Sequence, residues 1–343
     1  MANRRPTISD VARRAGVSKG SVSFALNGRD GVSEATRERI LSAAGELGWT
    51  PSLRARSLST SRAHAVGMVL ARDPALLGAD PFFPAFIAGV ESALAPVGQA
   101  LLLQVVPDQA DEFEAYRRLA DQGRVDGVFI ADLRANDPRI ELLAELPLAA
   151  VTLNRPDVDS PFPAVCEDDR AGIALLVRSL ADEGHTRISH VSGPMEYLHA
   201  RNRRQAWEEA LINADLAPGP LAVADFTAAG GRKATEQLLD GPSPPTAIIY
   251  ANDLMAIAGL SSAQQRGIGV PDQLSITGFG GSELSAHVHP ALTTVISDPF
   301  GWGQSAASAL LGVIDGNQPV TDIALPPVQL VLRASTGPAP SGA

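Results

Sequence analysis

The first fifty residues alternate apolar and polar positions with the period of short amphipathic helices. The apolar face of the first helix consists of Ile8, Val11, Ala12 and Ala15. Thr7 and Asp10 form a variant of the capping box that begins a helix, and Gly16 is a residue type that commonly ends one. The pattern therefore predicts a helix over residues 8–15.

Two further helices are predicted in the same region. Ser18 is expected to cap the second, which ends at Asn27-Gly28 and has an apolar face of Val22, Ala25 and Leu26. Ser33 is expected to cap the third, with an inward face of Ile40, Leu41, Ala44 and Leu47. The tight turn at 15–18 between the first two helices is typical of a helix-turn-helix unit, and a generic three-helix bundle is the alternative.

From residue 65 the pattern changes to short apolar runs that alternate with helical segments. The runs are 65–71, 100–106, 125–131, 148–154, 164–168, 187–193, 247–252 and 274–280. This alternation predicts parallel sheets with helices on both faces. Because so many strands are unusual for one sheet, we expect two similar α/β subdomains. A ligand would then bind in the cleft between them, at the carboxyl ends of the strands.

The distribution of charge separates the same two parts. The whole chain of 343 residues has a net charge of −10. Residues 1–62 carry eleven Lys or Arg and five Asp or Glu, a charge of +6, whereas the other 281 residues carry 17 and 33, a charge of −16. A small basic head beside a large acidic body predicts a polyanion as the partner of the head alone.

Composition narrows the class of protein further. The single cysteine, Cys166, excludes an internal disulfide framework and fits a reducing compartment. The chain has no apolar run near the roughly 20 residues of a membrane helix, and no apolar segment follows the N-terminal arginines as a secretion signal would require. We expect a cytoplasmic, nucleoid-associated protein without a membrane partner.

Several motifs along the chain point to one family. They are TISDVARRAGVSKGSVSFALNGRDGVSEATRERILSAAGELGWTPSLRARSLS (7–59), DPFFPAFIAGVESAL (80–94), DDRAGIALLVRSLADEGHTRISHVSGP (168–194), ARNRRQAWEEAL (200–211), PTAIIYANDLMAIAGL (245–260) and HPALTTVISDP (289–299). In this order they resemble bacterial repressors of the lactose-repressor (LacI) family, over essentially the whole chain.

The resemblance implies a helix-turn-helix head and a core built like a type I periplasmic binding protein from two parallel-sheet subdomains. The expected domains are a DNA-binding head at 1–50, a hinge helix and linker at 51–62, and an effector-binding and dimerisation core at 63–343. The expected subdomains are about 63–162 plus 293–323 and about 163–292 plus 324–336, with crossovers near 162, 292 and 323. Because the C-terminal tail is rich in Pro and Gly and lacks an apolar heptad, we expect a homodimer rather than a tetramer.

In this family the second helix enters the major groove of operator DNA. The positions expected to contact bases or phosphates are Thr7, Ser18, Lys19, Gly20, Ser21, Ser23, Phe24 and Asn27. Lys19 is able to donate to guanine. Phe24 stands where related repressors often carry a polar base-reading residue, so it either packs on a thymine methyl group or only supports the helix pack.

Residues 50–59 resemble the hinge helix of the family, which is too short to be stable alone and orders on DNA beside its dimer mate. Leu58 matches the wedge that opens the central base step from the minor groove. Leu53, Ala55 and Arg56 are expected in or near the same groove. A plain flexible linker is the alternative.

Three motifs of the body match the effector cleft of the family. Arg203 matches an effector-binding arginine, Asp253 a carboxylate that accepts from effector hydroxyls, and Phe226 an aromatic residue that stacks on a sugar. Further candidates are Phe82, Phe83, Asp132 and Arg155. An Asp with an Arg across a cleft suits a polyol, although such a pair is often only structural. After Gly278-Phe279 many relatives have two acidic residues, and this chain has Gly280 and Gly281 instead. Ser297 stands where the lactose repressor has an amide side chain, so no particular sugar is predicted.

These observations predict a ligand-responsive, sequence-specific transcriptional regulator. We expect a repressor of carbohydrate-utilisation genes that binds a palindromic operator as a homodimer and is released by a sugar-type inducer. A corepressor-dependent repressor that responds to a non-sugar metabolite is the alternative. No metal or cofactor is expected. An enzyme is disfavoured because the dinucleotide, P-loop and nucleophile-elbow motifs are missing from the sequence, and a secreted binding protein would not need the basic head.

Overall fold

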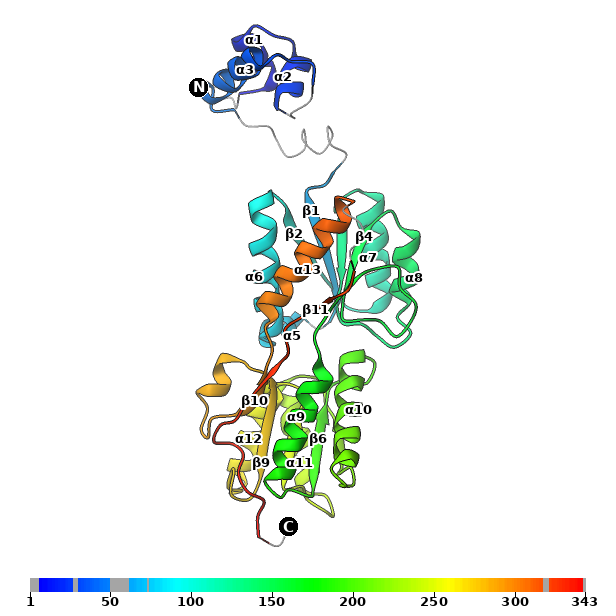
Figure 1. Cartoon of the computed structure of the whole chain (residues 1–343), viewed down its shortest axis with the longest axis vertical. Helices are drawn as coiled ribbons and strands as arrows, with labels where there is room; N and C mark the ends of the chain where they lie inside the picture. The colour runs from blue at the N-terminus through cyan, green and yellow to red at the C-terminus, as the bar shows by residue number, and fades with distance from the viewer. Residues whose placement is uncertain (1–5, 27–29, 50–61, 73, 317–320, 342–343) are drawn as a thin grey trace. The chain divides into compact units, whose positions relative to one another are not determined.

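The computed structural model describes residues 6–26, 30–49, 62–72, 74–316 and 321–341. The chain divides into two compact units, Met1–His64 and Ala65–Ala343 (Figure 1). The predicted DNA-contacting residues that lie outside the described residues are Asn27, Leu53, Ala55, Arg56 and Leu58.

The first unit contains three helices, α1 (Ile8–Ala15), α2 (Lys19–Leu26) and α3 (Glu34–Glu46). Its core consists of Val11, Ala12, Ala15, Val22, Ala25, Ile40, Ala43 and Ala44. The predicted apolar faces are confirmed, with one correction: Leu41 is 50% exposed. Because inward positions on a helix recur at steps of three and four residues, Ala43 and Ala44 follow Ile40 into the core while Leu41 is turned away.

The helix ends explain why these segments begin and stop where they do. The Asp10 carboxylate accepts from the backbone N–H of Thr7 at 2.9 Å and from its hydroxyl at 2.7 Å. Gly16 ends α1 in the left-handed conformation, with φ of 67°. Ser18 Oγ accepts from the backbone N–H of Ser21 at 3.0 Å, as expected for a cap. Ser33 occupies the cap position of α3, but its side chain accepts from no backbone N–H of that helix.

The second unit contains two six-stranded sheets. The first is parallel throughout, in the order β11-β5-β4-β3-β1-β2. Its strands are β1 (Ala65–Ala71), β2 (Ala100–Val106), β3 (Gly127–Ile130), β4 (Ala149–Leu153), β5 (Ala164–Cys166) and β11 (Ile323–Ala324). Its helices are α5 (Pro74–Ala79), α6 (Phe82–Leu94), the 3-10 turn η1 (Ala95–Val97), α7 (Gln109–Asp121), α8 (Pro138–Glu145) and α13 (Pro299–Ile314). Helices α6 and α13 bury their apolar sides on one face, and α7 and α8 on the other.

The second sheet has the order β12-β10-β9-β8-β6-β7, and only β12 runs antiparallel to its neighbour. Its strands are β6 (Ile188–Ser192), β7 (Leu221–Val223), β8 (Ala247–Tyr250), β9 (Ser275–Gly280), β10 (Thr293–Ile296) and β12 (Gln329–Val331). Its helices are α9 (Asp169–Asp182), α10 (Leu198–Asn213), α11 (Ala228–Leu239), α12 (Asp253–Gln265) and the 3-10 turn η2 (Glu283–Ala286). Helices α9 and α10 cover one face, and α11 and α12 cover the other.

The chain passes between the two sheets three times, through 167–168, 297–298 and 325–328. Two of the expected crossovers are therefore a few residues too early. β5 pairs with β4, so the first subdomain extends beyond 162. β10 pairs with β9, so the second subdomain extends beyond 292. No helix among the described residues is both long enough and apolar enough to cross a membrane.

Candidate functional site

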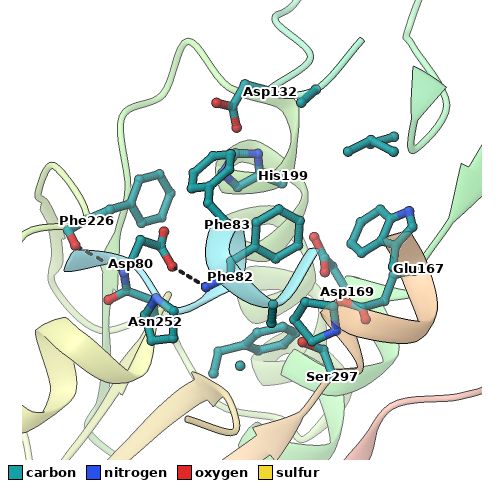
Figure 2. A pocket seen from close by; sticks show the side chains of 18 of the residues that line it. Asp80, Phe82, Phe83, Asp132, Glu167, Asp169, His199, Phe226, Asn252 and Ser297 are labelled. Carbon is teal, nitrogen blue, oxygen red and sulfur yellow. Dashed lines mark hydrogen bonds between the residues drawn. The ribbon is translucent and has the colours of Figure 1, made fainter. Parts of the chain in front are cut away.

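A cavity of about 310 Å³ lies where the strands of both sheets end, with walls from both subdomains. The lining residues that directly follow strands include Arg72, Ala131, Asn154, Glu167, Gly281 and Ser297. In parallel sheets the carboxyl ends of the strands are the usual place for a ligand. Figure 2 shows Glu167 and Asp169 on one side of the view and Phe226 and Asn252 on the other.

Aromatic rings form a large part of the wall. The lining includes Phe82, Phe83, Phe226, Phe279 and Trp302. The His199 ring stacks between the rings of Tyr197 and Phe226, with centroids 5.5 and 5.3 Å away. Such flat apolar faces are suited to the C–H faces of a ring-shaped ligand.

Arg72, which follows β1, is buried in this wall, and its side chain is only 5% exposed. Its Nε and Nη2 donate to the two carboxylate oxygens of Asp132 at 2.5 and 2.7 Å. Its guanidinium carbon also lies 5.2, 5.0 and 5.7 Å from the ring centroids of Phe83, Tyr197 and Phe226. Burial opposes ionisation of Asp132, but the charge and the hydrogen bonds of Arg72, together with nearby positive charge, outweigh burial and lower the pKa of that carboxyl. We therefore describe Arg72 and Asp132 as an ionised pair.

Arg203, on α10, forms a second pair in the cavity. Its Nη2 donates to Asp169 at 3.1 Å and its Nη1 donates to the carbonyl of Ala251 at 2.6 Å. The guanidinium lies 4.0 Å from the centre of the Phe279 ring. Its Nε has no hydrogen-bond partner among the described residues. Arg203 is thus fixed by the protein, and within the described part of the chain its buried Nε–H is left unpaired.

Asp253, the first residue of α12, is 2% exposed and already accepts two hydrogen bonds. One oxygen accepts from Thr294 Oγ1 and the other from the backbone N–H of Ser282, both at 2.6 Å. Burial raises the pKa of Asp253, although these bonds oppose the rise. The bond to Ser282 fixes the turn after β9. In that turn Gly281 has φ of 70°, a left-handed backbone conformation that glycine adopts more readily than the acidic residue that many relatives have at this position.

Helix α2, the helix predicted to enter the major groove of operator DNA (the reading helix), presents part of its surface to solvent. Ser18, Lys19, Gly20 and Phe24 are exposed, Phe24 by 41%, and Ser21 and Ser23 are half-buried. Two arginines of α3 have structural contacts instead. Arg37 donates to the carbonyl of Ala25 and Arg39 to that of Ala15, at 2.9 and 3.0 Å. They satisfy carbonyls at the ends of α2 and α1.

Comparison with known proteins identifies the family. Residues 7–52 match the bacterial regulatory proteins of the lacI family, and residues 177–336 match the periplasmic binding protein-like domain. The chain is 33% identical to the HTH-type transcriptional repressor CytR of Escherichia coli (strain K12), over 96% of both chains. The chain belongs to the LacI family. It is a ligand-responsive, DNA-binding transcriptional repressor with a periplasmic-binding-protein-like core.

Further relatives of this LacI-family chain agree in sequence and fold. It is 33% identical to the HTH-type transcriptional regulator CelR of Thermobifida fusca, over 96% of each chain. The structure of a CelR–cellobiose complex is similar with a TM-score of 0.74 and 30% identity, covering 96% of this chain and 100% of that one. The lac repressor dimer bound to operator and the anti-inducer ONPF gives a TM-score of 0.86 at 28% identity, covering 97% and 100%.

The cavity brings together most of the effector residues that were predicted for this LacI-family chain. Those that line it are Phe82, Phe83, Asp132, Arg203, Phe226 and Asp253. Arg155 does not line it, and that expectation is corrected: its side chain is 63% exposed and paired with Asp322. This partner lies next to β11 at the edge of the first sheet, which holds Arg155 away from the cavity.

Sequence reasoning missed several lining residues of this LacI-family site. They include Arg72, Asp80, Glu167, Asp169 and His199. Arg72 and Glu167 each come directly after a strand. A charged residue at the end of an apolar run is therefore the signal from which sequence reasoning would have found them. The described residues contain no group of three or more His, Cys, Asp or Glu side chains placed to hold a metal ion.

Glu167 titrates in an unusual range. Burial and the neighbouring Asp169 carboxylate raise its pKa to about 8, from an ordinary value of 4.5. Between these values the unfolded chain loses the Glu167 proton while the folded chain keeps it. Stability contributed by the protonated group is therefore complete below pH 4.5 and is lost as pH rises towards about 8.

The variant Glu167→Gln should remove this pH dependence because glutamine does not titrate. From pH 5 to pH 8 we expect the Tm of the wild type to fall relative to that of Glu167→Gln. Thermal unfolding at several pH values measures the difference, with Glu145→Gln at an exposed position of α8 as the matched control. A constant difference in Tm across this range would contradict the assignment.

Proposed function

We propose that this LacI-family repressor binds a carbohydrate in the cavity and is then released from a palindromic operator, which it holds as a homodimer. The observation that carries the proposal is the cavity, in which aromatic faces surround two arginine–carboxylate pairs. The assignment of 1–50 to the head, 51–62 to the hinge and 63–343 to the core is part of the proposal. The proposal also puts the site of action at the chromosome, in the cytoplasm.

The chemistry of the cavity suits a sugar. Sugar hydroxyls both donate and accept hydrogen bonds, so they need carboxylates and guanidinium groups in one site. The volume of about 310 Å³ is near the lower end of the range of about 300–1,000 Å³ for ligand pockets, which favours a small ligand. The complex of CelR with cellobiose supports the same class of ligand in a similar fold.

The proposed DNA contacts are those of the reading helix and its surroundings. Lys19 and Phe24 are exposed and available to base edges, and Ser18 and Ser21 to phosphates. Thr7 donates both its hydroxyl and its backbone N–H to Asp10, so these donors would have to rearrange before they could bind a phosphate. Leu58 and its neighbours remain predictions from the sequence.

The connection between ligand and DNA is proposed to run through the crossovers. Glu167 and Ser297 lie in two of the segments that join the subdomains, and both line the cavity. Beside the cavity, the N–H of Leu198 donates to the carbonyl of Leu133 at 2.8 Å, which joins the subdomains directly. A ligand that favours one relative position of the subdomains shifts the population of the DNA-binding state by its differential affinity.

The variant Phe226→Ala tests the assignment of the effector site. Removing this ring should raise the sugar concentration needed for half-maximal release from the operator by at least about tenfold. Aromatic side chains dominate the energetics of binding sites, so the loss of one weakens sugar binding. Operator binding without sugar should change little. Fluorescence anisotropy of labelled operator, titrated with cellobiose and other common mono- and disaccharides, measures both quantities.

Phe300→Ala is the matched control, because Phe300 is 42% exposed on α13 and does not line the cavity. It should behave as the wild type in both measurements. Unchanged sugar release in Phe226→Ala would remove this cavity as the effector site. Tighter operator binding with sugar would reverse the proposed direction of the response.

A further inference from the structure

The cavity has an unequal balance of charged side chains. Among the described residues, the carboxyls that line it are Asp80, Asp132, Glu167, Asp169, Asp253 and Glu283. The guanidinium groups that line it are those of Arg72 and Arg203. His199 does not add a positive charge near neutral pH, because burial and the nearby Arg203 lower its pKa to about 4.

Both arginines already have carboxylate partners. Arg72 uses two nitrogens on Asp132, and Arg203 uses one on Asp169. Within the part of the chain that the structure describes, the cavity is therefore lined by no cation without a carboxylate partner.

Four lining carboxyls have no such compensation. Asp80, Glu167, Asp253 and Glu283 have no ion-pair partner within 4 Å among the described residues. One oxygen of Asp80 accepts from the backbone N–H of Phe82 at 3.1 Å, which Figure 2 marks with a dashed line. Burial raises the pKa of Asp80, as expected for a carboxyl that lacks a paired cation.

An anionic ligand in this cavity would find no lining cation that is not already paired with a carboxylate. A phosphate or carboxylate in a site that excludes water needs charge-assisted donors, and arginine normally provides them. Here, turning Arg72 or Arg203 towards the ligand would leave Asp132 or Asp169 buried without its partner, which is strongly destabilising. A second negative charge beside the Asp80 carboxylate would add repulsion.

We propose that the effector is an uncharged or amine-bearing carbohydrate, and that the pocket excludes sugar phosphates and sugar acids. The inference rests on the proposed function and adds selection by charge. A repressor with this pocket responds to a free sugar before the sugar is phosphorylated or oxidised to an acid.

The test uses the full-length protein and isothermal titration at one pH and one salt concentration. The ligands are common neutral mono- and disaccharides, each beside its amino form and its phosphate or carboxylate form, for example glucose, glucosamine, glucose 6-phosphate and glucuronate. We expect anionic forms to bind at least about tenfold more weakly than their neutral counterparts, because like charges brought together at a binding site are strongly disfavoured. Amino forms should bind as well as the neutral sugars or better.

The outcomes separate this inference from the proposed function. An anionic form that binds more tightly than its neutral counterpart overturns the selection by charge, while the carbohydrate proposal stands. Absence of binding across the whole panel removes the carbohydrate proposal, and with it the inference.

The variant Asp80→Asn tests the cause of the selection, since asparagine keeps the oxygen that accepts from Phe82 but removes the charge. We expect the ratio of neutral to anionic affinity to shrink by about threefold or more. Asp121→Asn, at an exposed position of α7, is the matched control and should leave the ratio unchanged. An unchanged ratio in Asp80→Asn would overturn the electrostatic explanation.

Discussion

Replacing Arg72 by methionine is expected to lower the free energy of unfolding by about 3–5 kcal/mol, the usual cost of removing one partner of a buried ion pair. Methionine fills part of the space between the rings of Phe83, Tyr197 and Phe226, so the lost volume is small. The loss comes mainly from the Asp132 carboxylate, which remains buried without its cation. Denaturant unfolding of the purified protein measures the change.

Two further variants show whether this explanation is correct. In the double variant Arg72→Met/Asp132→Asn the uncompensated charge is gone, so most of the lost stability should return. Arg201→Met is the matched control for the loss of an arginine, because Arg201 is exposed and, among the described residues, donates only to the carbonyl of Met195. If the double variant is no more stable than Arg72→Met, the ion pair is not the reason for the loss.

Gly89→Ala is expected to cost about 3 kcal/mol of stability, at the upper end of what overpacking a core usually costs. Helix α6 packs along α13 (Figure 1), and Gly89 lies on α6 against the backbone of Phe300 on α13. A methyl group there would be 2.0 Å from the carbonyl oxygen of Phe300, a backbone atom that has little room to move. From the facing helix, a methyl group on Gly303 would be 2.2 Å from the carbonyl oxygen of Phe86. Glycines on both helices thus permit the close approach.

Gly78→Ala provides the control, since Gly78 is also a helical glycine of the same unit but has no atom within 4 Å of the added methyl group. It should be neutral or stabilising by up to about 1 kcal/mol, because alanine favours helix. Thermal and denaturant unfolding of both variants give the comparison. Equal stability of the two variants would contradict close contact between α6 and α13.

The sequence was sufficient to predict most of the helices and strands, because their periodicity is a local property of the chain. Every apolar run predicted from residue 65 onwards contains a strand, and the inward positions of the head were predicted except at Leu41. The short strands β7, β10 and β11 were not predicted as runs. They contain three, four and two residues. Missing β10 placed one crossover too early.

The cavity was less predictable, because it depends on which side chains pair after folding. Arg72 and Asp132 are 60 residues apart and meet only because β1 and β3 are neighbours in the sheet. Arg155 had the residue type of an effector ligand, but its contact with Asp322 could not be read from the sequence. Asp253 was expected to face a ligand, whereas the bonds it makes within the protein became visible only in the structure.

The central claim is that one chain joins sequence-specific DNA binding to a sugar-responsive cavity. Selection of binding sites from random DNA by the purified full-length protein tests it most directly, at one near-physiological salt concentration because affinity for DNA depends on salt. We expect a palindromic site to be enriched without ligand and the enrichment to fall when a neutral sugar of the panel is added. If no sequence is enriched, either without ligand or with any sugar, the account is contradicted.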